Sequence, residues 1–159
     1  MEDSFRPTIL WIRLNMTFQL IYQEIQKTLK KEHLTLPQLD ILVCLGRTEG
    51  LTLGEIGERL MVTGGNITGV MDRLEKSGYV YRDRDKTDRR IVRAKLTTDG
   101  FLLHKEILPI FTKKWNEIVN ILELDEQRQL SRLLKKWSQS LLTSGSYKKA
   151  REGRAISHA

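Results

Sequence analysis

Residues 63–73, with the sequence TGGNITGVMDR, combine small residues with side chains that can form hydrogen bonds. Apolar residues at positions 67, 70, 71 and 74 follow helical spacing, which predicts a helix with one face in a core. The opposite side then presents Gly65, Asn66, Thr68, Gly69 and Asp72. An asparagine amide can form two hydrogen bonds with an adenine edge, and a threonine can offer its hydroxyl to a base or its methyl to thymine. This face therefore has the chemistry needed to read base edges.

Three glycines, Gly64, Gly65 and Gly69, stand in the first turns of this helix, and each costs up to about 1 kcal/mol relative to alanine. Two explanations stay open. Either the glycines admit a neighbouring part of the fold, or they let an outside partner approach and leave backbone N–H groups accessible to phosphate. The candidate contact residues of this segment are Thr63, Gly64, Gly65, Asn66, Thr68, Gly69 and Arg73. Arg73 fits a phosphate contact or an ion pair with Asp88, and Asp72 fits a structural ion pair better than base reading.

Residues 82–95 form a second distinctive run, in which cations are interleaved with aspartates. The cations are Arg82, Arg84, Lys86, Arg89, Arg90, Arg93 and Lys95. An arginine at a hairpin tip can enter a narrow minor groove, where the potential is most negative, and the aspartates suit holding arginines in place. The candidate contact residues here are Arg84, Lys86, Asp88, Arg89 and Arg90. A solvated charged hairpin is the competing interpretation.

Capping residues and apolar periodicity predict the helices that position the first run. Residues 8–32 carry apolar side chains at spacings of three and four, which indicates a long amphipathic helix. Thr35 and Thr52 each begin a further helix, with Gln or Glu three residues later completing a capping box. The helix after Thr52 is short and runs to about Met61, and Thr63 then caps the candidate base-reading helix.

That helix is expected to end at Gly78, because glycine is favoured just after a helix C-terminus. The segments YVYRDRD and RIVRAKLT alternate apolar with charged residues, which predicts a strand hairpin. A long helix is expected from about 98 to 122, capped by Thr97 or Asp99, and Asp125 is expected to cap a final helix.

This order of elements predicts a mostly α fold: a winged helix–turn–helix, with helices plus a two-stranded wing hairpin, whose N- and C-terminal helices form a dimerisation region. The long end helices carry one-sided apolar stripes with no evident cover in so small a core, and such surfaces mark interfaces. We expect an N-terminal dimerisation helix at 1–34, a DNA-binding lobe at 35–100, C-terminal dimerisation helices at 101–143 and a basic flexible tail at 144–159.

Composition narrows the class of protein. The 159 residues carry a net charge of +7, and the isoelectric point near 9.6 favours a polyanionic partner, nucleic acid before a membrane surface. Cys44 is the only cysteine, which excludes a disulfide framework, and its apolar neighbours favour an inert core thiol. No apolar stretch approaches the length of a membrane span and the N-terminus lacks signal-peptide features, so we expect a cytoplasmic protein.

Catalysis is not expected. The sequence shows no nucleophile–base pair and no plausible pair of catalytic carboxylates, and GGNITG lacks the Gly-Lys-Ser/Thr ending of a phosphate-binding loop. The histidines are too dispersed for a metal site. We therefore predict no catalytic residue, metal or cofactor.

The run from Leu51 to Gly100 resembles the MarR family of bacterial and archaeal transcriptional regulators. DRLEKSG, from Asp72 to Gly78, matches the end of the family's recognition helix. The segment beginning at Asp88 matches its wing, with Asp-Arg-Arg, an alternating strand and Leu-Thr-x-x-Gly. The flanking helices match as well, so the resemblance covers roughly residues 8–143. One departure is the glycine-rich helix start, because many relatives carry arginine or serine at positions 64 and 65.

The resemblance implies an obligate homodimer, built from the first and last helices, on a pseudo-palindromic site in double-stranded DNA. It gives Arg90 a minor-groove role at the wing tip, and it implies a small, aromatic or anionic effector. We therefore expect a homodimeric, sequence-specific transcriptional regulator, a repressor relieved by its effector. The alternative is a winged-helix interaction module that binds protein or RNA.

Overall fold

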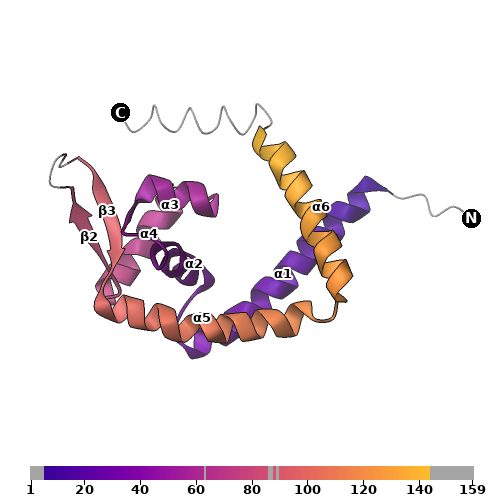
Figure 1. The fold of residues 1–159 in the computed structure, drawn as a ribbon, viewed down its shortest axis with the longest axis horizontal. Helices are drawn as coiled ribbons and strands as arrows, with labels where there is room; N and C mark the ends of the chain where they lie inside the picture. The colour runs from indigo at the N-terminus through magenta and orange to yellow at the C-terminus, as the bar shows by residue number, and fades with distance from the viewer. Residues whose placement is uncertain (1–5, 63, 86–87, 89, 144–159) are drawn as a thin grey trace, which may run out of the picture. The chain divides into compact units, whose positions relative to one another are not determined.

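The computed structural model describes residues 6–62, 64–85, 88 and 90–143 (Figure 1). The elements in chain order are α1 (Pro7–Lys31), α2 (Leu36–Leu45), β1 (Leu51–Thr52), α3 (Leu53–Leu60), α4 (Gly64–Lys76), β2 (Val80–Arg84), β3 (Val92–Leu96), α5 (Thr98–Val119) and α6 (Leu124–Thr143). Helices with a strand hairpin after α4 confirm the predicted winged helix–turn–helix class. The predictions for Thr63, Lys86, Arg89 and the tail at 144–159 fall outside the described residues.

The chain forms two compact units, Met1–Trp115 and Asn116–Ala159, and the boundary between them falls within α5. The first unit contains α1 to β3 and most of α5, and the second contains α6. None of the helices in the described part of the chain is long and apolar enough to cross a membrane.

The sheet has three antiparallel strands in the order β1–β3–β2. Strands β2 and β3 are the predicted hairpin, paired from Val80 opposite Leu96 to Arg84 opposite Val92. Strand β1 was not predicted, because two residues are too few for an alternating pattern to appear. It sets Leu51 opposite Ala94 and so ties the start of α3 to the wing.

The core of the first unit lies among α2, α3 and α4, which contact one another and the sheet (Figure 1). Its buried apolar residues are Ile25, Leu29, Leu34, Leu39, Ile41, Leu42, Leu45, Leu51, Ile56, Ile67, Val70, Met71, Leu74, Val80, Ala94 and Ile107. The helix α4 supplies four of them, at positions 67, 70, 71 and 74. Burial of this stripe fixes which side of α4 faces outward.

The helix ends that lead towards α4 follow the predicted capping chemistry. The Thr52 backbone N–H donates to Glu55 Oε2 at 2.7 Å, and the Glu55 N–H donates to Thr52 Oγ1 at 3.1 Å. The Thr35 N–H donates to Gln38 Oε1 at 2.9 Å. Met61 then ends α3 in the left-handed conformation, with φ of 55°. The capping predictions for Thr35 and Thr52 are confirmed.

Of the two caps proposed for α5, the structure selects Thr97. Its Oγ1 accepts from the Gly100 N–H at 3.0 Å and donates to the Gly78 carbonyl at 2.6 Å, so it also ties the wing to the end of α4. Gly100 is required, because a β-carbon there would lie 1.8 Å from the Tyr79 carbonyl oxygen. The helix ends at Val119, earlier than the predicted 122.

The prediction that Asp125 caps α6 is wrong. Asp125 lies inside the helix, where its Oδ1 accepts from Arg128 at 3.1 Å. The backbone N–H of Glu123, which precedes the helix, donates instead to Glu126 Oε2 at 2.8 Å. Glu123 is therefore the residue before the helix, and Glu126, three residues after it, accepts from its backbone N–H as in a capping box. The helix accordingly begins at Leu124, one residue before Asp125.

Cys44 is half-buried rather than enclosed in the core. Burial is the main cause that raises the pKa of its thiol. A thiol with a raised pKa stays protonated near neutral pH and is a poor nucleophile. The position thus differs from the predicted core thiol, and the inertness of the thiol stays a prediction that the direction of this pKa supports.

His104 lies on α5 and is only 9% exposed. Neither of its buried ring nitrogens has a hydrogen-bond partner. A β-carbon at Gly46, just after α2, would lie 2.6 Å from Nε2, so the ring is packed closely against the end of that helix. Burial lowers the pKa of His104, and the positive charge of Arg47 lowers it further. The folded protein therefore favours the neutral ring.

We expect acid to destabilise the wild type more than a His104→Phe variant. Because the pKa of His104 is lowered in the folded chain, the unfolded chain takes up a proton first as the pH falls below about 6.5. Each pH unit over which only the unfolded chain is protonated removes about 1.4 kcal/mol of unfolding free energy. Denaturant unfolding at neutral pH and near pH 5.5 measures this loss, and equal losses in both proteins would contradict it.

Candidate nucleic-acid interface

The helix α4 has one buried and one exposed side, as its periodicity predicts. The buried residues are Ile67, Val70, Met71 and Leu74. The exposed residues are Gly65, Asn66, Thr68, Asp72 and Arg73, and Gly69 is half-exposed. The structure thus brings an amide, a hydroxyl and a guanidinium to the outward side of one helix, next to two glycines.

Two glycines of α4, Gly65 and Gly69, have no close packing neighbour in the described structure. A β-carbon added at Gly65 would meet nothing within 4 Å, and one at Gly69 would meet only Arg73 Nη1, at 3.7 Å. Gly57 on α3 differs, because a β-carbon there would lie 2.9 Å from Ile67 Cδ1. Close helix packing therefore explains Gly57 but neither Gly65 nor Gly69.

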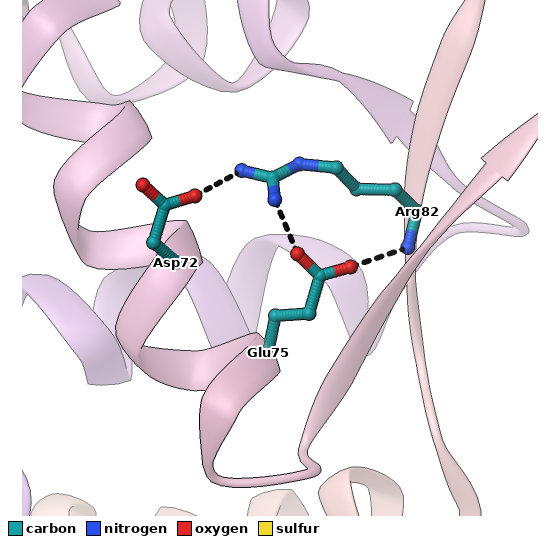
Figure 2. A network of polar contacts seen from close by, with 3 residues as sticks. All are labelled: Asp72, Glu75 and Arg82. Carbon is teal, nitrogen blue, oxygen red and sulfur yellow. Dashed lines mark hydrogen bonds and ion pairs between the residues drawn. The ribbon is translucent and has the colours of Figure 1, made fainter.

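Arg82, on β2, joins the wing to α4 through two carboxylates (Figure 2). Its Nη2 lies 2.6 Å from Asp72 Oδ1, and its Nη1 pairs with Glu75. The Arg82 backbone N–H also donates to Glu75 Oε1 at 3.3 Å. The hydrogen bond with Asp72 is the first cause that raises the pKa of Arg82. Both the side chain and the backbone N–H of Arg82 thus connect the wing to one side of α4.

Sequence reasoning identified Asp72 as an ion-pair partner but missed Arg82 as its counterpart. A signal was present, because Asp72 and Glu75 are three residues apart and therefore share one side of the helix. The other proposed pair, Arg73 with Asp88, is not formed. Arg73 is exposed, and Asp88 pairs with Arg90 instead.

Asp88 organises the backbone at the far end of the wing. Its Oδ1 accepts from the Arg90 N–H at 3.0 Å and lies 3.4 Å from Arg90 Nε. Its own N–H donates to Asp85 Oδ1 at 3.1 Å, and its carbonyl accepts from the Ile91 N–H at 2.9 Å. The Arg90 side chain is nevertheless 94% exposed. Asp88 therefore fixes the backbone from which the Arg90 side chain extends, while the Arg90 guanidinium remains in solvent.

Two other cations of the wing are held by carboxylates. Arg93 Nη1 lies 3.2 Å from Glu55 Oε2, which ties β3 to α3. Lys95 Nζ lies 2.8 Å from Asp83 Oδ2 on the neighbouring strand, and this hydrogen bond is the main cause that raises the pKa of Lys95. Arg84, at the end of β2, is exposed. Two kinds of cation are thus present in the wing. Arg93 and Lys95 are held by carboxylates of α3 and the neighbouring strand, whereas the side chains of Arg84 and Arg90 are exposed.

No group of three or more His, Cys, Asp or Glu side chains able to hold a metal ion is found among the described residues. What α4 and the wing offer is hydrogen bonding and positive charge. These are the two kinds of interaction that fix a protein on a nucleic-acid backbone and read its bases.

We expect Gly69→Ala to stabilise the fold. The added methyl group meets only Arg73, and alanine is favoured over glycine inside a helix by about 0.5–1 kcal/mol. The thermal midpoint should rise by about 2–4 °C per kcal/mol in a chain of this size. Gly57→Ala is the matched control and should destabilise, since its methyl meets Ile67. A lower midpoint for Gly69→Ala would reveal a packing role absent from the described contacts.

Replacing Arg82 with glutamine should lower the unfolding free energy by about 1 kcal/mol, the scale of a partly exposed ion pair. The loss should shrink in about 1 M salt, where exposed charges are screened. The control is Lys27→Gln, which removes an exposed pair with Glu24 inside α1 and should change little. Chemical unfolding of the three proteins at two salt concentrations measures both effects. A salt-independent loss at Arg82 would argue against an ion pair.

Comparison with known proteins identifies relatives of the chain. The MarR family model matches residues 34–92. Over 84 residues the chain is 42% identical to YkoM of Bacillus subtilis, an HTH-type transcriptional regulator, and this alignment spans 53% of the chain and 54% of YkoM. An HTH-type transcriptional regulator of Bacillus cereus is 30% identical over 139 residues, which are 86% of the chain and 91% of that protein.

Two solved structures share the fold. A mutant MarR from E. coli in complex with operator DNA is 29% identical, with a TM-score of 0.75, over 85% of the chain and 98% of that structure. Bordetella bronchiseptica BpsR, whose DNA binding is regulated by 6-hydroxynicotinic acid, is 25% identical, with a TM-score of 0.75. This match covers 81% of the chain and 98% of the BpsR structure. With the winged fold and the exposed side of α4, these matches show that the chain belongs to the MarR family of DNA-binding transcriptional regulators.

Proposed function

We propose that the chain is a homodimeric repressor that occupies a pseudo-palindromic site in double-stranded DNA and leaves it when a small aromatic or anionic effector binds. The observation that carries the DNA contact is the exposed side of α4. There Gly65 and Gly69 lack any internal neighbour that requires glycine, and they flank Asn66 and Thr68. Glycines that weaken a helix without improving its packing fit the close approach of a large outside partner.

In this proposal α4 enters the major groove with its N-terminal half towards the base edges. Asn66 bonds an adenine edge, and Thr68 offers its hydroxyl to a base or its methyl to thymine. Arg73 is exposed further along the helix and contacts phosphate. Thr63 and Gly64 complete the contact set by their place at the helix start.

The wing supplies the minor-groove contact. Arg90 extends into solvent from a backbone that Asp88 holds. Its guanidinium can therefore enter a narrow groove without first losing buried contacts. Arg84 is also exposed and adds positive charge near the phosphates. Lys86 and Arg89 belong to the same set by their place between these residues.

Exposed apolar side chains support dimerisation through the first and last helices. On α1 they are Ile9, Leu10, Trp11, Ile12, Leu14, Met16, Phe18 and Leu20. On α6 they are Leu124, Leu130, Leu133, Leu134, Trp137, Leu141 and Leu142, and α6 has no buried residue. Apolar surface of this extent marks an interface. We assign dimerisation to residues 1–34 and 101–143, DNA binding to 35–100, and no further role to the tail at 144–159.

The regulatory part of the proposal is supported by the two structural relatives, one bound to operator DNA and one regulated by 6-hydroxynicotinic acid. A two-fold dimer presents its recognition helices to half-sites about 34 Å apart, one turn of DNA. An effector that binds more tightly to a dimer with another spacing of the two DNA-binding lobes shifts the protein towards that spacing. The affinity for DNA then falls by the ratio of the effector's affinities for the two arrangements.

Selection from random duplex DNA tests the proposed function. The full-length protein should enrich two half-sites related by two-fold symmetry, with centres about 10 base pairs apart. Transcription in vitro from a promoter that carries this site should then fall when the protein is added. A parallel selection uses random RNA. Enrichment from the RNA pool alone, or from neither pool, would instead favour the alternative of an interaction module for RNA or protein.

Arg90→Ala should nearly eliminate binding to the selected site while the fold and the dimer persist, because the side chain lies almost wholly in solvent. The loss should be larger for A·T-rich flanks, where a narrow minor groove deepens the negative potential. Titrations at one fixed salt concentration, with Lys27→Ala as control, measure it. If Arg90→Ala binds within about twofold of wild type, about 0.4 kcal/mol, Arg90 has no such role.

Replacing Leu134 and Trp137 together with glutamate should abolish both the dimer and DNA binding. Two charges would then stand in the apolar face of α6, where burying an unpaired charge is strongly unfavourable. Gln129→Glu, a change at an exposed polar position of the same helix, is the control. Sedimentation at micromolar concentration measures the assembly, and a wild-type monomer would contradict the proposal.

A further inference from the structure

Two large apolar side chains stand in solvent between α3 and α4. Met61 is 59% exposed and Val62 is 38% exposed. We call this pair the apolar turn. One residue separates it from the start of α4 at Gly64, and Asn66 and Thr68 are exposed in the first turns of that helix. Neither side chain of the apolar turn belongs to the buried core.

The backbone of the apolar turn does not favour methionine. Met61 has φ of 55° and ψ of 34°, the left-handed region in which helices commonly end with glycine or asparagine. A β-carbon is unfavourable in this region because it crowds the following carbonyl oxygen. The position therefore retains a long apolar side chain that the backbone disfavours and the core does not use.

The apolar turn is nevertheless held in place. The Met61 and Val62 backbone N–H groups both donate to the Gly57 carbonyl, the second at 3.1 Å. A β-carbon at Gly57 would lie 3.3 Å from the Val62 carbonyl oxygen and 2.9 Å from Ile67 Cδ1. Glycine at this position lets α3, the turn and α4 pack closely, so the backbone of Met61 and Val62 is held in place relative to α4.

The residue types near the start of α4 thus contradict the preferences of the local backbone in two ways. At Gly65 and Gly69 the chain has glycine where helix stability favours alanine. At Met61 it has a long side chain where the backbone favours glycine. Sites at which residue choice contradicts local structure, without gain in packing, are expected to be functional.

We propose that Met61 and Val62 contact thymine C5-methyl groups in the major groove, beside the base pairs faced by Asn66. The inference rests on the proposed DNA binding and adds the source of its sequence preference. Thymine is the only unmodified base with an apolar group at its major-groove edge, so an apolar side chain selects it. The chain has no arginine between Thr63 and Asp72, so bidentate arginine readout of guanine is absent from this part of α4.

The two side chains are suited to different parts of this contact. Valine is stiff at χ1 and presents its methyl groups at a fixed place. Methionine has three rotatable bonds and a polarizable sulfur, so it can adapt to a neighbouring methyl group. Together they select thymine without any new hydrogen bond.

The test removes single methyl groups from the DNA. Each thymine of the duplex selected by the full-length protein is replaced in turn by uracil, which lacks only the C5 methyl. At one or two positions in each half-site the wild type should bind about three- to fivefold more weakly, the effect of losing one buried methyl group. Methylated cytosine placed there should bind more tightly than plain cytosine.

Variants assign the methyl contact to the apolar turn. Met61→Gly and Val62→Ala should each bind thymine and uracil duplexes equally well at one of the sensitive positions. Met61→Gly also relieves the left-handed backbone, so its thermal midpoint should not fall and lost binding will not reflect unfolding. Met61→Leu keeps an apolar side chain and should retain the preference for thymine.

The outcomes separate this inference from the proposed function. If no duplex is selected, both fail. If a duplex is selected but uracil at every position costs less than about 1.5-fold, or if Met61→Gly and Val62→Ala keep the full preference, only the methyl readout fails. A dimer that dissociates in Met61→Gly would place the apolar turn in a protein interface and would also overturn it.

Discussion

The bridge from Arg82 to Asp72 and Glu75 sets the geometry on which the rest of the interface depends (Figure 2). A two-stranded hairpin is marginally stable alone, so a wing keeps its direction only if other elements hold it. Here β1 pairs with one strand, and Arg82 joins the other to α4. Thr97 adds a third tie, because its hydroxyl donates to the carbonyl at the end of α4. The wing and α4 therefore form one piece with two chemically different surfaces.

The residues of α4 divide into a buried side that stabilises the fold and an exposed side that we propose contacts DNA. The buried side of α4 follows the rules of a helix packed on a core, and Gly57 lets α3 approach it closely. The outward side departs from those rules at Gly65 and Gly69, which no neighbour requires, and the turn before α4 departs from them with Met61 in the left-handed region. The protein can tolerate this because the apolar stripe of α4 is fully anchored. These departures lower local stability without improving the packing, and the proposed DNA contact would account for them.

The charged residues show the same division. Arg82, Arg93 and Lys95 are held by carboxylates from α4, α3 and the neighbouring strand, and they orient the wing. Arg90 is directed by Asp88 but remains in solvent. Similar residue types in one short run therefore lie in two environments, which differ in the exposure of the side chain. The exposed apolar side chains of α1 and α6 form a separate category, since they do not join the buried core.

The sequence by itself determined the helices, the hairpin of β2 and β3, the faces of α4 and the caps at Thr35 and Thr52, because periodicity and capping are local and show in the order of residues. The family followed from the resemblance of two motifs, the end of α4 and the wing. Tertiary structure alone decided that Arg82 is the partner of Asp72, that Leu51 pairs with the wing and that Asp125 does not cap α6. It also decided that His104 is buried and that Gly69, unlike Gly57, has no packing neighbour that requires it. Partner choice and burial depend on residues distant in the chain coming together, and one sequence carries no local signal of which will meet.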